Sequence, residues 1–197
     1  MIADTLVLSP GGLTPRNTDA AFGPGPDQTG VPFAKAEYAY DRLDVTRLTK
    51  IRGGFTWILR FEAQAASSNL LPSEQLNVGG MDTVRGYEED VAGGPDGILA
   101  STEIRGPPVS PLAAWGSAGP ARDQLQPDVF VDYAHVFNVH AIPGAPSSID
   151  LASAGLGARY QVGSRLIMRA ECGFPFDAPP GVRRRAEFAN IEVTLSL

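Results

Sequence analysis

The feature that most constrains the fold is an apolar residue at every second position, which recurs along most of the chain. The clearest case is FTWILRFEAQ at residues 55–64, where alternate side chains are apolar from Phe55 to Phe61. Because successive side chains of a β-strand point to opposite faces, this pattern predicts a strand with one apolar and one polar face. The same pattern predicts seven strands and a fragment of an eighth. They cover residues 5–8 (the fragment), 33–49, 55–64, 98–105, 129–138, 151–162, 166–176 and 190–197.

The composition agrees with many short strands and turns. The 197 residues include 22 Gly and 17 Pro, and charged residues make up 19% of the chain, against roughly 25% in typical soluble domains. A net charge of −6 argues against a nucleic-acid partner. No apolar run approaches the roughly 18 residues of a transmembrane helix. The start, MIADTLVLSPGG, has neither the basic residues nor the apolar length of a signal peptide, so none is expected in this chain.

Alternation alone is compatible with a soluble sandwich or a membrane barrel. A sandwich turns its apolar faces inward, whereas a barrel turns them to lipid and lines its lumen with polar residues. The polar faces of this chain carry both signs of charge, which can neutralise one another across a lumen. The residues expected to face the lumen are Arg60, Glu62, Glu103, Arg105, Arg159, Arg169 and Glu171. The candidates for aromatic girdles are Tyr38, Tyr40, Trp57, Tyr133 and Tyr160.

The lengths of the connections favour the barrel. Antiparallel strands place alternate connections at the same end, and outer-membrane barrels have long loops at one end and short turns at the other. The long connections 68–97, 141–150 and 177–184 share one end, and the short turns 50–54 and 163–164 share the other. The connection 106–127 breaks this rule, because it is long at the short end.

The connection at residues 68–97 contains the most specific motif, LNVGGMDTVRGY at residues 76–87. Gly79 and Gly80 permit a tight turn with positive φ, and Gly86 lets another backbone come close. Arg85 offers five donors in a rigid fork. Such a loop is expected to pack into the structure; the alternative is a polar hairpin loop with an incidental arginine.

These motifs resemble those of a known family. GGMDTVRGY follows LLPSEQ and precedes STEIRGP, and further pieces stand in the family's order: LSPGGLTPRNTDAAF at 8–22, AEYAYDRLDVTRLT at 36–49 and VFVDYAHV at 129–136. From about residue 6 to its end, the chain resembles the two-partner-secretion transporters. These are the haemolysin activators of the ShlB/FhaC/HecB type, within the BamA-like superfamily of outer-membrane barrels.

The resemblance implies an all-β, antiparallel membrane β-barrel that exports a large partner protein across the outer membrane without ATP. Residues 1–197 would form its C-terminal half, with seven to eight strands, incomplete on its own and without POTRA domains. The implied partners are a secreted exoprotein, outer-membrane lipid, the barrel-insertion machinery and the missing N-terminal barrel half. The chain departs from the family at its end, because such barrels usually finish with an aromatic residue and this chain finishes Leu-Ser-Leu.

The resemblance also implies a contact between the loop and the barrel wall. In the family the signature loop folds back into the barrel, where its arginine meets the aspartate of an F-x-D motif. These positions are Arg85 and Asp132 here, the latter preceded by Phe130; the alternative is a free Arg85 and an Asp132 satisfied by neighbouring strands. The signature-loop residues are Gly79, Gly80, Val84, Arg85, Gly86 and Tyr87.

The residues predict no enzyme, cofactor or metal site. His135 and His140 are five apart on one expected strand and would point to opposite faces, so they cannot share a metal. Cys172 is the single cysteine and is expected to be a small apolar side chain in a strand. The glycine-rich motif lacks the Lys-Ser/Thr of a phosphate-binding loop. Two alternatives to the transporter stay open: a truncated or decayed fragment without activity of its own, and a soluble β-module that binds a protein or ligand.

Overall fold

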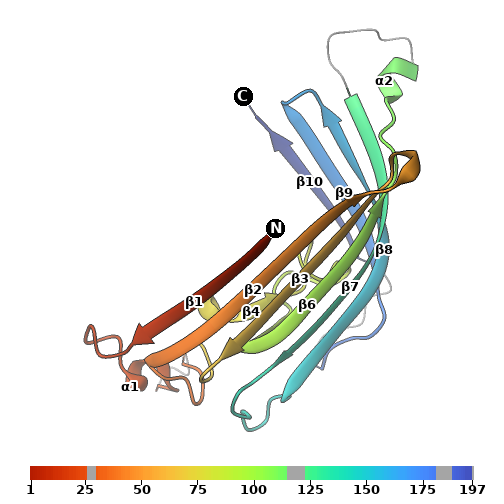
Figure 1. Ribbon diagram of the computed structural model, residues 1–197. Helices are drawn as coiled ribbons and strands as arrows, with labels where there is room; N and C mark the ends of the chain where they lie inside the picture. The colour runs from red at the N-terminus through yellow and green to blue at the C-terminus, as the bar shows by residue number, and fades with distance from the viewer. Residues whose placement is uncertain (26–29, 115–122, 181–187, 197) are drawn as a thin grey trace.

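A computed structural model describes residues 1–25, 30–114, 123–180 and 188–196 (Figure 1). Eight strands form one antiparallel sheet in the order β1-β2-β3-β6-β7-β8-β9-β10. The all-β, antiparallel fold is therefore as predicted, at the upper end of the expected seven to eight strands. The strands are β1 (Ile2–Pro10), β2 (Glu37–Lys50), β3 (Thr56–Ala66), β6 (Asp96–Arg105), β7 (Asp123–Phe137), β8 (Ser148–Val162), β9 (Leu166–Pro175) and β10 (Phe188–Leu195).

Short elements occupy the connections between these strands. A second, two-stranded sheet, β4 (Leu76–Val78) with β5 (Ala92–Gly94), lies within the connection from β3 to β6. The helical segments are α1 (Asp19–Phe22), α2 (Pro111–Ala114) and the 3-10 turns η1 (Arg52–Gly54) and η2 (Pro72–Glu74). Among the residues that the structure describes, no helix is long and apolar enough to cross a membrane.

Five strands, β1, β6, β7, β8 and β10, begin earlier than the apolar pattern predicts, and β7 shows the largest difference. The expected fragment at residues 5–8 belongs to the nine-residue strand β1, which pairs with β2 from Ile2 to Pro10. Strand β7 begins at Asp123, because the chain after β6 pairs with it: Gly106 N donates to Pro127 O, and Val109 and Leu125 exchange two backbone hydrogen bonds. Part of the connection 106–127 is therefore strand, although residues 115–122 of that connection lie outside the described residues.

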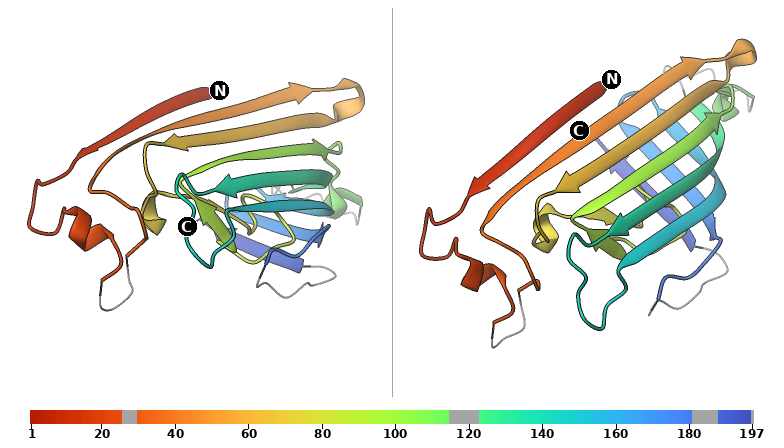
Figure 2. Two further views of the ribbon diagram at one scale, coloured as in Figure 1. Left: turned by 90° about the horizontal axis from the view of Figure 1, so that it is seen from below. Right: turned by 60° about the horizontal axis from the view of Figure 1, so that its bottom comes forward.

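The sheet curves but does not close. Strands β1 and β10 are its two edges among the described residues, and the sheet forms an open arc in Figure 2. The antiparallel order places the β1–β2, β3–β6, β7–β8 and β9–β10 connections at one end, and the other three connections at the opposite end. The connection from β3 to β6 folds back over the concave face of the arc (Figures 1 and 2).

The two faces of the sheet differ in chemistry as the alternation predicts. The convex face exposes apolar side chains, including Val129, Val131, Leu156 and Phe174. Strand register places Ser101 opposite Asp132, and Asp132 opposite Ser153, so that these polar residues share the concave face. They are buried there because the folded-back connection covers them.

The apolar core lies between this connection and the concave face. One half comes from the connection, and the other from β6, β7 and β8. The buried cluster consists of Leu76, Val78, Val84, Tyr87, Ala92, Leu99, Ala134, Val136 and Leu151. The second layer of the core is thus the loop with its two short strands, and not a second large sheet.

The structure contradicts one expectation about the aromatic residues. Tyr38 and Tyr40 were expected in an outer girdle, but Tyr40 lies opposite Ala66, two residues along β2 from the Arg42–Gln64 pair on the concave face. Its hydroxyl donates to Glu74 Oε2 of the connection at 2.9 Å. A period of two shows which residues share a face, but the pairing with β3 decides which face that is. Trp57, Tyr133 and Tyr160 lie on the convex face, as expected of girdle residues.

This core predicts unequal effects for two leucines of β8. Leu151 is fully buried under the loop, whereas Leu156 is 56% exposed on the convex face. Leu151→Ala leaves a cavity and is expected to lower the free energy of unfolding by about 2–5 kcal/mol, well above the loss for Leu156→Ala. Denaturant titration of both variants in the same assembled barrel and detergent measures the difference. Equal losses would show that the loop does not complete the core.

Candidate functional site

Glycines shape the tip of the connection that folds onto the concave face. Gly79, Gly80 and Gly86 have φ angles of 110°, 97° and 99°, a region that disfavours residues with a Cβ atom. A Cβ at Gly79 would lie 2.4 Å from Glu88 O, so space excludes a side chain as well. Thr83 closes the turn, because its Oγ1 accepts from Gly79 N at 2.8 Å and donates to Gly79 O at 2.7 Å. These bonds present the following Val84 and Arg85 to the sheet.

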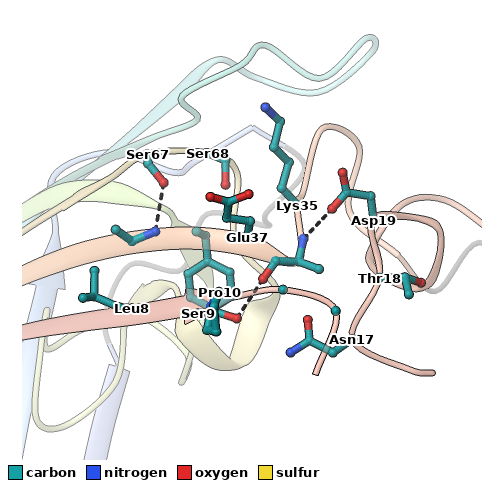
Figure 3. A pocket seen from close by; sticks show the side chains of 15 residues that line it. Leu8, Ser9, Pro10, Asn17, Thr18, Asp19, Lys35, Glu37, Ser67 and Ser68 are labelled. Carbon is teal, nitrogen blue, oxygen red and sulfur yellow. Dashed lines mark hydrogen bonds between the residues drawn. The ribbon is translucent and has the colours of Figure 1, made fainter. Parts of the chain in front are cut away.

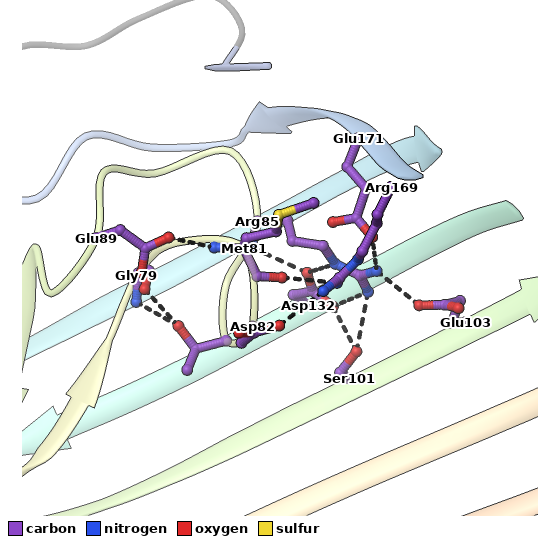
Figure 4. Close-up of polar contacts among 11 residues, drawn as sticks. Gly79, Met81, Asp82, Arg85, Glu89, Ser101, Glu103, Asp132, Arg169 and Glu171 are labelled. Atoms are coloured by element: carbon purple, nitrogen blue, oxygen red, sulfur yellow. Dashed lines mark hydrogen bonds and ion pairs between the residues drawn. The ribbon is translucent and has the colours of Figure 1, made fainter. Parts of the chain in front are cut away.

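Arg85 binds Asp132 of β7 through a two-pronged contact (Figure 4). Its Nε donates to Asp132 Oδ2 at 2.7 Å, and its Nη2 donates to Asp132 Oδ1 at 2.8 Å. The backbone N of Arg85 adds a third bond to Oδ2 at 3.1 Å. The two residues are 2% and 0% exposed, so this is a buried, charge-assisted pair with the geometry that Arg and a carboxylate favour.

The remaining donors of Arg85 find partners on other strands. Nη1 donates to Glu103 Oε2 at 2.7 Å and lies 3.4 Å from Glu171 Oε1, and Nη2 donates to Ser101 Oγ at 3.2 Å. The Phe130 ring lies under the guanidinium, with its centroid 3.6 Å from Cζ, as in a cation–π contact. Burial alone would lower the pKa of Arg85, but the bonds to Asp132 and Glu103 and the charge of Glu171 hold it above its ordinary value.

Tyr87 and Gly86 hold the loop against the strands beyond β7. The Tyr87 hydroxyl lies 3.0 Å from Ala152 O of β8 and 2.8 Å from Asp177 O after β9. Gly86 touches the backbone of Gly173 in β9, because a Cβ on Gly86 would lie 2.9 Å from Gly173 C. The motif VRGY thus contacts several strands of the sheet with four consecutive residues.

Other contacts anchor the base of the loop, and the sequence reasoning did not identify them. Gln64 Nε2 donates to Glu74 O at 3.0 Å and to Pro95 O at 2.9 Å, which ties the two ends of the loop to β3. Asn69 is fully buried and exchanges hydrogen bonds with the backbone of His140. The available signal was a glutamine on the polar face of the strand that leads into the loop.

The residues expected to face a lumen all lie on the concave face by register. Arg105 binds Glu103, and Arg169 binds Glu171 at 2.7 Å, so these four surround Arg85. Glu62 lies 3.5 Å from Arg42, at some distance from the loop tip. Arg60 shares that part of the face, and Arg159 lines a cavity of about 210 Å³ beside Arg169.

Three carboxylates beside Arg85 come close enough to consider a metal ion. One oxygen from each of Glu103, Asp128 and Glu171 lies within 4.8 Å of the others. Glu103 and Glu171 already accept hydrogen bonds from Arg85, Arg105 and Arg169, so guanidinium groups balance most of the negative charge. Asp128 Oδ1 and Glu171 Oε2 are buried without a hydrogen-bond partner among the described residues. We therefore assign these carboxylates to the network of ion pairs that Arg85, Arg105 and Arg169 form, and not to a metal site.

The two histidines lie apart. His135 is on the convex face, where its Nδ1 lies 2.9 Å from Asp150 Oδ1, and His140 lies in the β7–β8 connection with its ring stacked 5.8 Å from that of Phe33. Two further acidic residues bind the backbone: Glu89 of the loop accepts from Met81 N, and Asp96 at the start of β6 accepts from Ala66 N. These carboxylates are thus bound to separate backbone groups.

A cavity of about 1100 Å³ lies at the edge of the sheet, between the end of β1 and the β1–β2 connection (Figure 3). Ser9 Oγ donates to Ala36 O at 2.7 Å, and Ala36 N donates to Asp19 Oδ1 at 2.7 Å. These bonds hold the connection to the edge strand. Ser68, at the start of the loop, lines the cavity, whereas the loop-tip residues Gly79, Gly80, Val84, Arg85, Gly86 and Tyr87 do not.

A curved antiparallel sheet with a long connection packed on its concave face is the architecture of part of a β-barrel wall. The family described as haemolysin secretion/activation protein ShlB/FhaC/HecB matches residues 16–160. The chain belongs to this family of two-partner-secretion transporters, which are not enzymes and whose barrels lie in the outer membrane.

Solved structures show the same fold. CdiB from Escherichia coli matches with a TM-score of 0.68 and 18% identity, over 89% of this chain and 30% of that chain. CdiB from Acinetobacter baumannii matches with a TM-score of 0.58 and 21% identity, over 82% of this chain and 27% of that chain. The chain thus spans less than a third of the length of these two structures. A comparison with curated proteins found no match.

The geometry predicts strong coupling between Arg85 and Asp132. Removing one partner of a buried pair leaves an uncompensated charge and is expected to lower the free energy of unfolding by about 3–5 kcal/mol. The loss for the double variant Arg85→Ala/Asp132→Ala should be much smaller than the sum of the two single losses. Denaturant titration of the four proteins measures the coupling energy.

The control is Arg165→Ala, which removes an exposed arginine in the turn between β8 and β9. It should change the free energy of unfolding little, and its effect should add to that of Asp132→Ala. Additive losses for Arg85→Ala and Asp132→Ala would mean that the two residues act independently.

Proposed function

We propose that the chain forms the C-terminal part of the wall of an outer-membrane barrel that exports a large partner protein without ATP. The convex face meets lipid and the concave face lines the lumen. The signature loop, residues 68–97, is a fixed part of that lumen. The partners are a secreted exoprotein, outer-membrane lipid and the barrel-insertion machinery.

The observation that carries this proposal is the buried contact of Arg85 with Asp132 under a loop that covers the concave face. A surface loop would gain little from ordering so many residues, because closing and fixing a long loop costs conformational entropy. Here buried charge-assisted bonds and an apolar cluster offset that cost. An interior surface held in a set shape suits a pore through which another protein passes.

The convex face supports contact with lipid. On β7 and β8 this face presents apolar side chains with exposed fractions of 55% at Val129 and 56% at Leu156, whereas Asp128, Asp132 and Arg159 of the same strands point to the concave side. A soluble β-module would leave this apolar surface in water, where such patches favour association. The lipid-facing assignment therefore explains the exposure better than a soluble module does.

The open edges support a larger barrel. Each edge strand presents unpaired backbone groups, which cost several kcal/mol apiece in lipid. The outer edges of β1 and β10 therefore need further strands, and we assign these to the rest of the barrel. The same edges favour the second candidate, a fragment without activity of its own, wherever those strands are missing.

Secretion tests the function directly. Comparing the culture medium of cells with and without the transporter identifies the exported protein. Arg85→Ala and Asp132→Ala are each expected to lower its secretion by at least about 30-fold, because the expected loss of about 3–5 kcal/mol exceeds the roughly 2 kcal/mol that corresponds to that factor, and the double variant should be little worse. The control Arg165→Ala should secrete normally. If deleting the transporter removes no protein from the medium, the fragment without activity is the correct assignment.

The lipid-facing assignment predicts opposite tolerance at neighbouring positions of β3. Leu59 is on the convex face and Arg60 on the concave face. Leu59→Arg is expected to cost about 2–4 kcal/mol at the middle of the bilayer, and Arg60→Leu much less. Unfolding of the assembled barrel in lipid vesicles measures both. A protein that stays monomeric in water without detergent would contradict the assignment to a membrane.

A further inference from the structure

We propose that strand β9 carries a second dock for the signature loop, formed by Arg169 and Gly173, in addition to the contact of Arg85 with Asp132. The role assigned to this dock rests on the function proposed above, because it positions a loop inside the export barrel. Both residues are positioning residues that act through the loop.

Arg169 binds the loop at Met81 and Asp82, which precede Arg85 in the chain. Its Nη1 donates to Asp82 Oδ1 at 2.7 Å, and its Nη2 donates to Met81 O at 2.9 Å. Its Nε donates to Glu171 Oε1 at 2.7 Å, which fixes the guanidinium plane on the strand (Figure 4). The planar guanidinium group of Arg169 thus joins the Asp82 side chain and the Met81 carbonyl of the loop tip to β9. The ammonium group of a lysine cannot reproduce this geometry.

The Met81 peptide is held from both sides. Its N donates to Glu89 Oε1 of the same loop at 2.8 Å, while its O accepts from Arg169. Arg169 is therefore connected through the Met81 peptide to Glu89, which lies in the part of the loop that follows Tyr87. Glu171 connects the two docks, because its Oε1 also lies 3.4 Å from Arg85 Nη1.

Gly173 provides the surface on which the loop rests. A Cβ at Gly173 would lie 2.5 Å from Gly86 N and 2.7 Å from Arg85 C, distances that real Cβ atoms do not show. The two backbones therefore touch only because both residues are glycine. Gly173 pairs with Gly155 in β8, where a Cβ would lie 2.3 Å from the Phe130 ring. The loop thus rests on a stretch of wall without side chains.

The two docks attach the loop to different parts of the sheet. Asp132 and Glu103 hold Arg85 on β7 and β6, in the middle of the sheet. Arg169 and Gly173 hold the tip on β9, which is next to the edge strand β10. The loop therefore spans from the centre of the sheet to the strand beside its edge, and losing the β9 dock should loosen the loop tip even though Asp132 is present.

Cysteine labelling of Val84 in the assembled barrel tests this proposal. Val84 is 0% exposed under the loop, so Val84→Cys should react slowly with a water-soluble maleimide while the loop is docked. Cys172→Ser removes the single native cysteine from the background. Arg169→Ala and Gly173→Ala should each raise the labelling rate by about 5–30-fold, as expected when one stabilising contact of a local equilibrium is lost. Arg169→Lys should give a labelling rate between those of the parent protein and Arg169→Ala, because lysine keeps the positive charge but loses the planar guanidinium group.

Two controls and one coupling experiment separate a dock from a general defect of β9. Met168→Ala on the convex face and Arg165→Ala in the β8–β9 turn should leave the labelling rate unchanged. Asp82 has a side chain 84% exposed, so Asp82→Ala should not disturb folding. It should raise labelling by itself and add little to Arg169→Ala, whereas a merely structural role of Arg169 would give independent effects.

The outcomes distinguish this proposal from the proposed function. Unchanged labelling in Arg169→Ala and Asp82→Ala would overturn the β9 dock, and so would additive effects of the two. If Gly173→Ala does not assemble into the barrel, the labelling rates of Arg169→Ala, Asp82→Ala and Arg169→Lys test the β9 dock. If labelling responds as expected but no protein depends on the transporter for secretion, the dock stands and the export function fails.

Discussion

The structure depends on the burial of one guanidinium group. Arginine keeps its charge under all ordinary conditions, and an unpaired buried charge is very unfavourable, so Arg85 can lie under the loop only where acceptors surround it. Asp132, Glu103 and Ser101 supply these acceptors from two adjacent strands. This requirement explains why the concave face is polar at its centre and why the loop tip must approach at one position.

The loop and the sheet complete each other. The concave face contributes Leu99, Ala134, Val136 and Leu151 to the apolar cluster, and these side chains are buried only because the loop covers them. The loop in turn has few bonds of its own, with its two short strands and the Thr83 turn as the main local ones. Neither part has an apolar core without the other, so the docked loop and this region of the sheet stabilise each other.

The open sheet explains how a chain of this kind fits into a transporter. An antiparallel arc with two unpaired edges has the curvature of a barrel wall, and the matched CdiB structures are more than three times as long as the matched part. The alternation along each strand then serves two purposes. It exposes apolar side chains on the convex side, and it places most of the charged ones on the concave side, where Arg85 of the loop and the strand residues Arg105 and Arg169 bind the carboxylates.

The sequence by itself determined the strands of the large sheet, the sets of residues that share a face, and Gly79, Gly80 and Gly86 as positions where the loop needs glycine. It also pointed, through the family motif, to Arg85 and Asp132, which the structure brings to 2.7 Å. Tertiary structure decided the strand register and which face of each strand is concave, because a period of two does not define how the strands pair. Register placed Tyr40 on the concave face and started β7 at Asp123. The contacts of Arg169 with Met81 and Asp82, and of Gly173 with Gly86, join segments more than 80 residues apart, and local sequence holds no information about such distances.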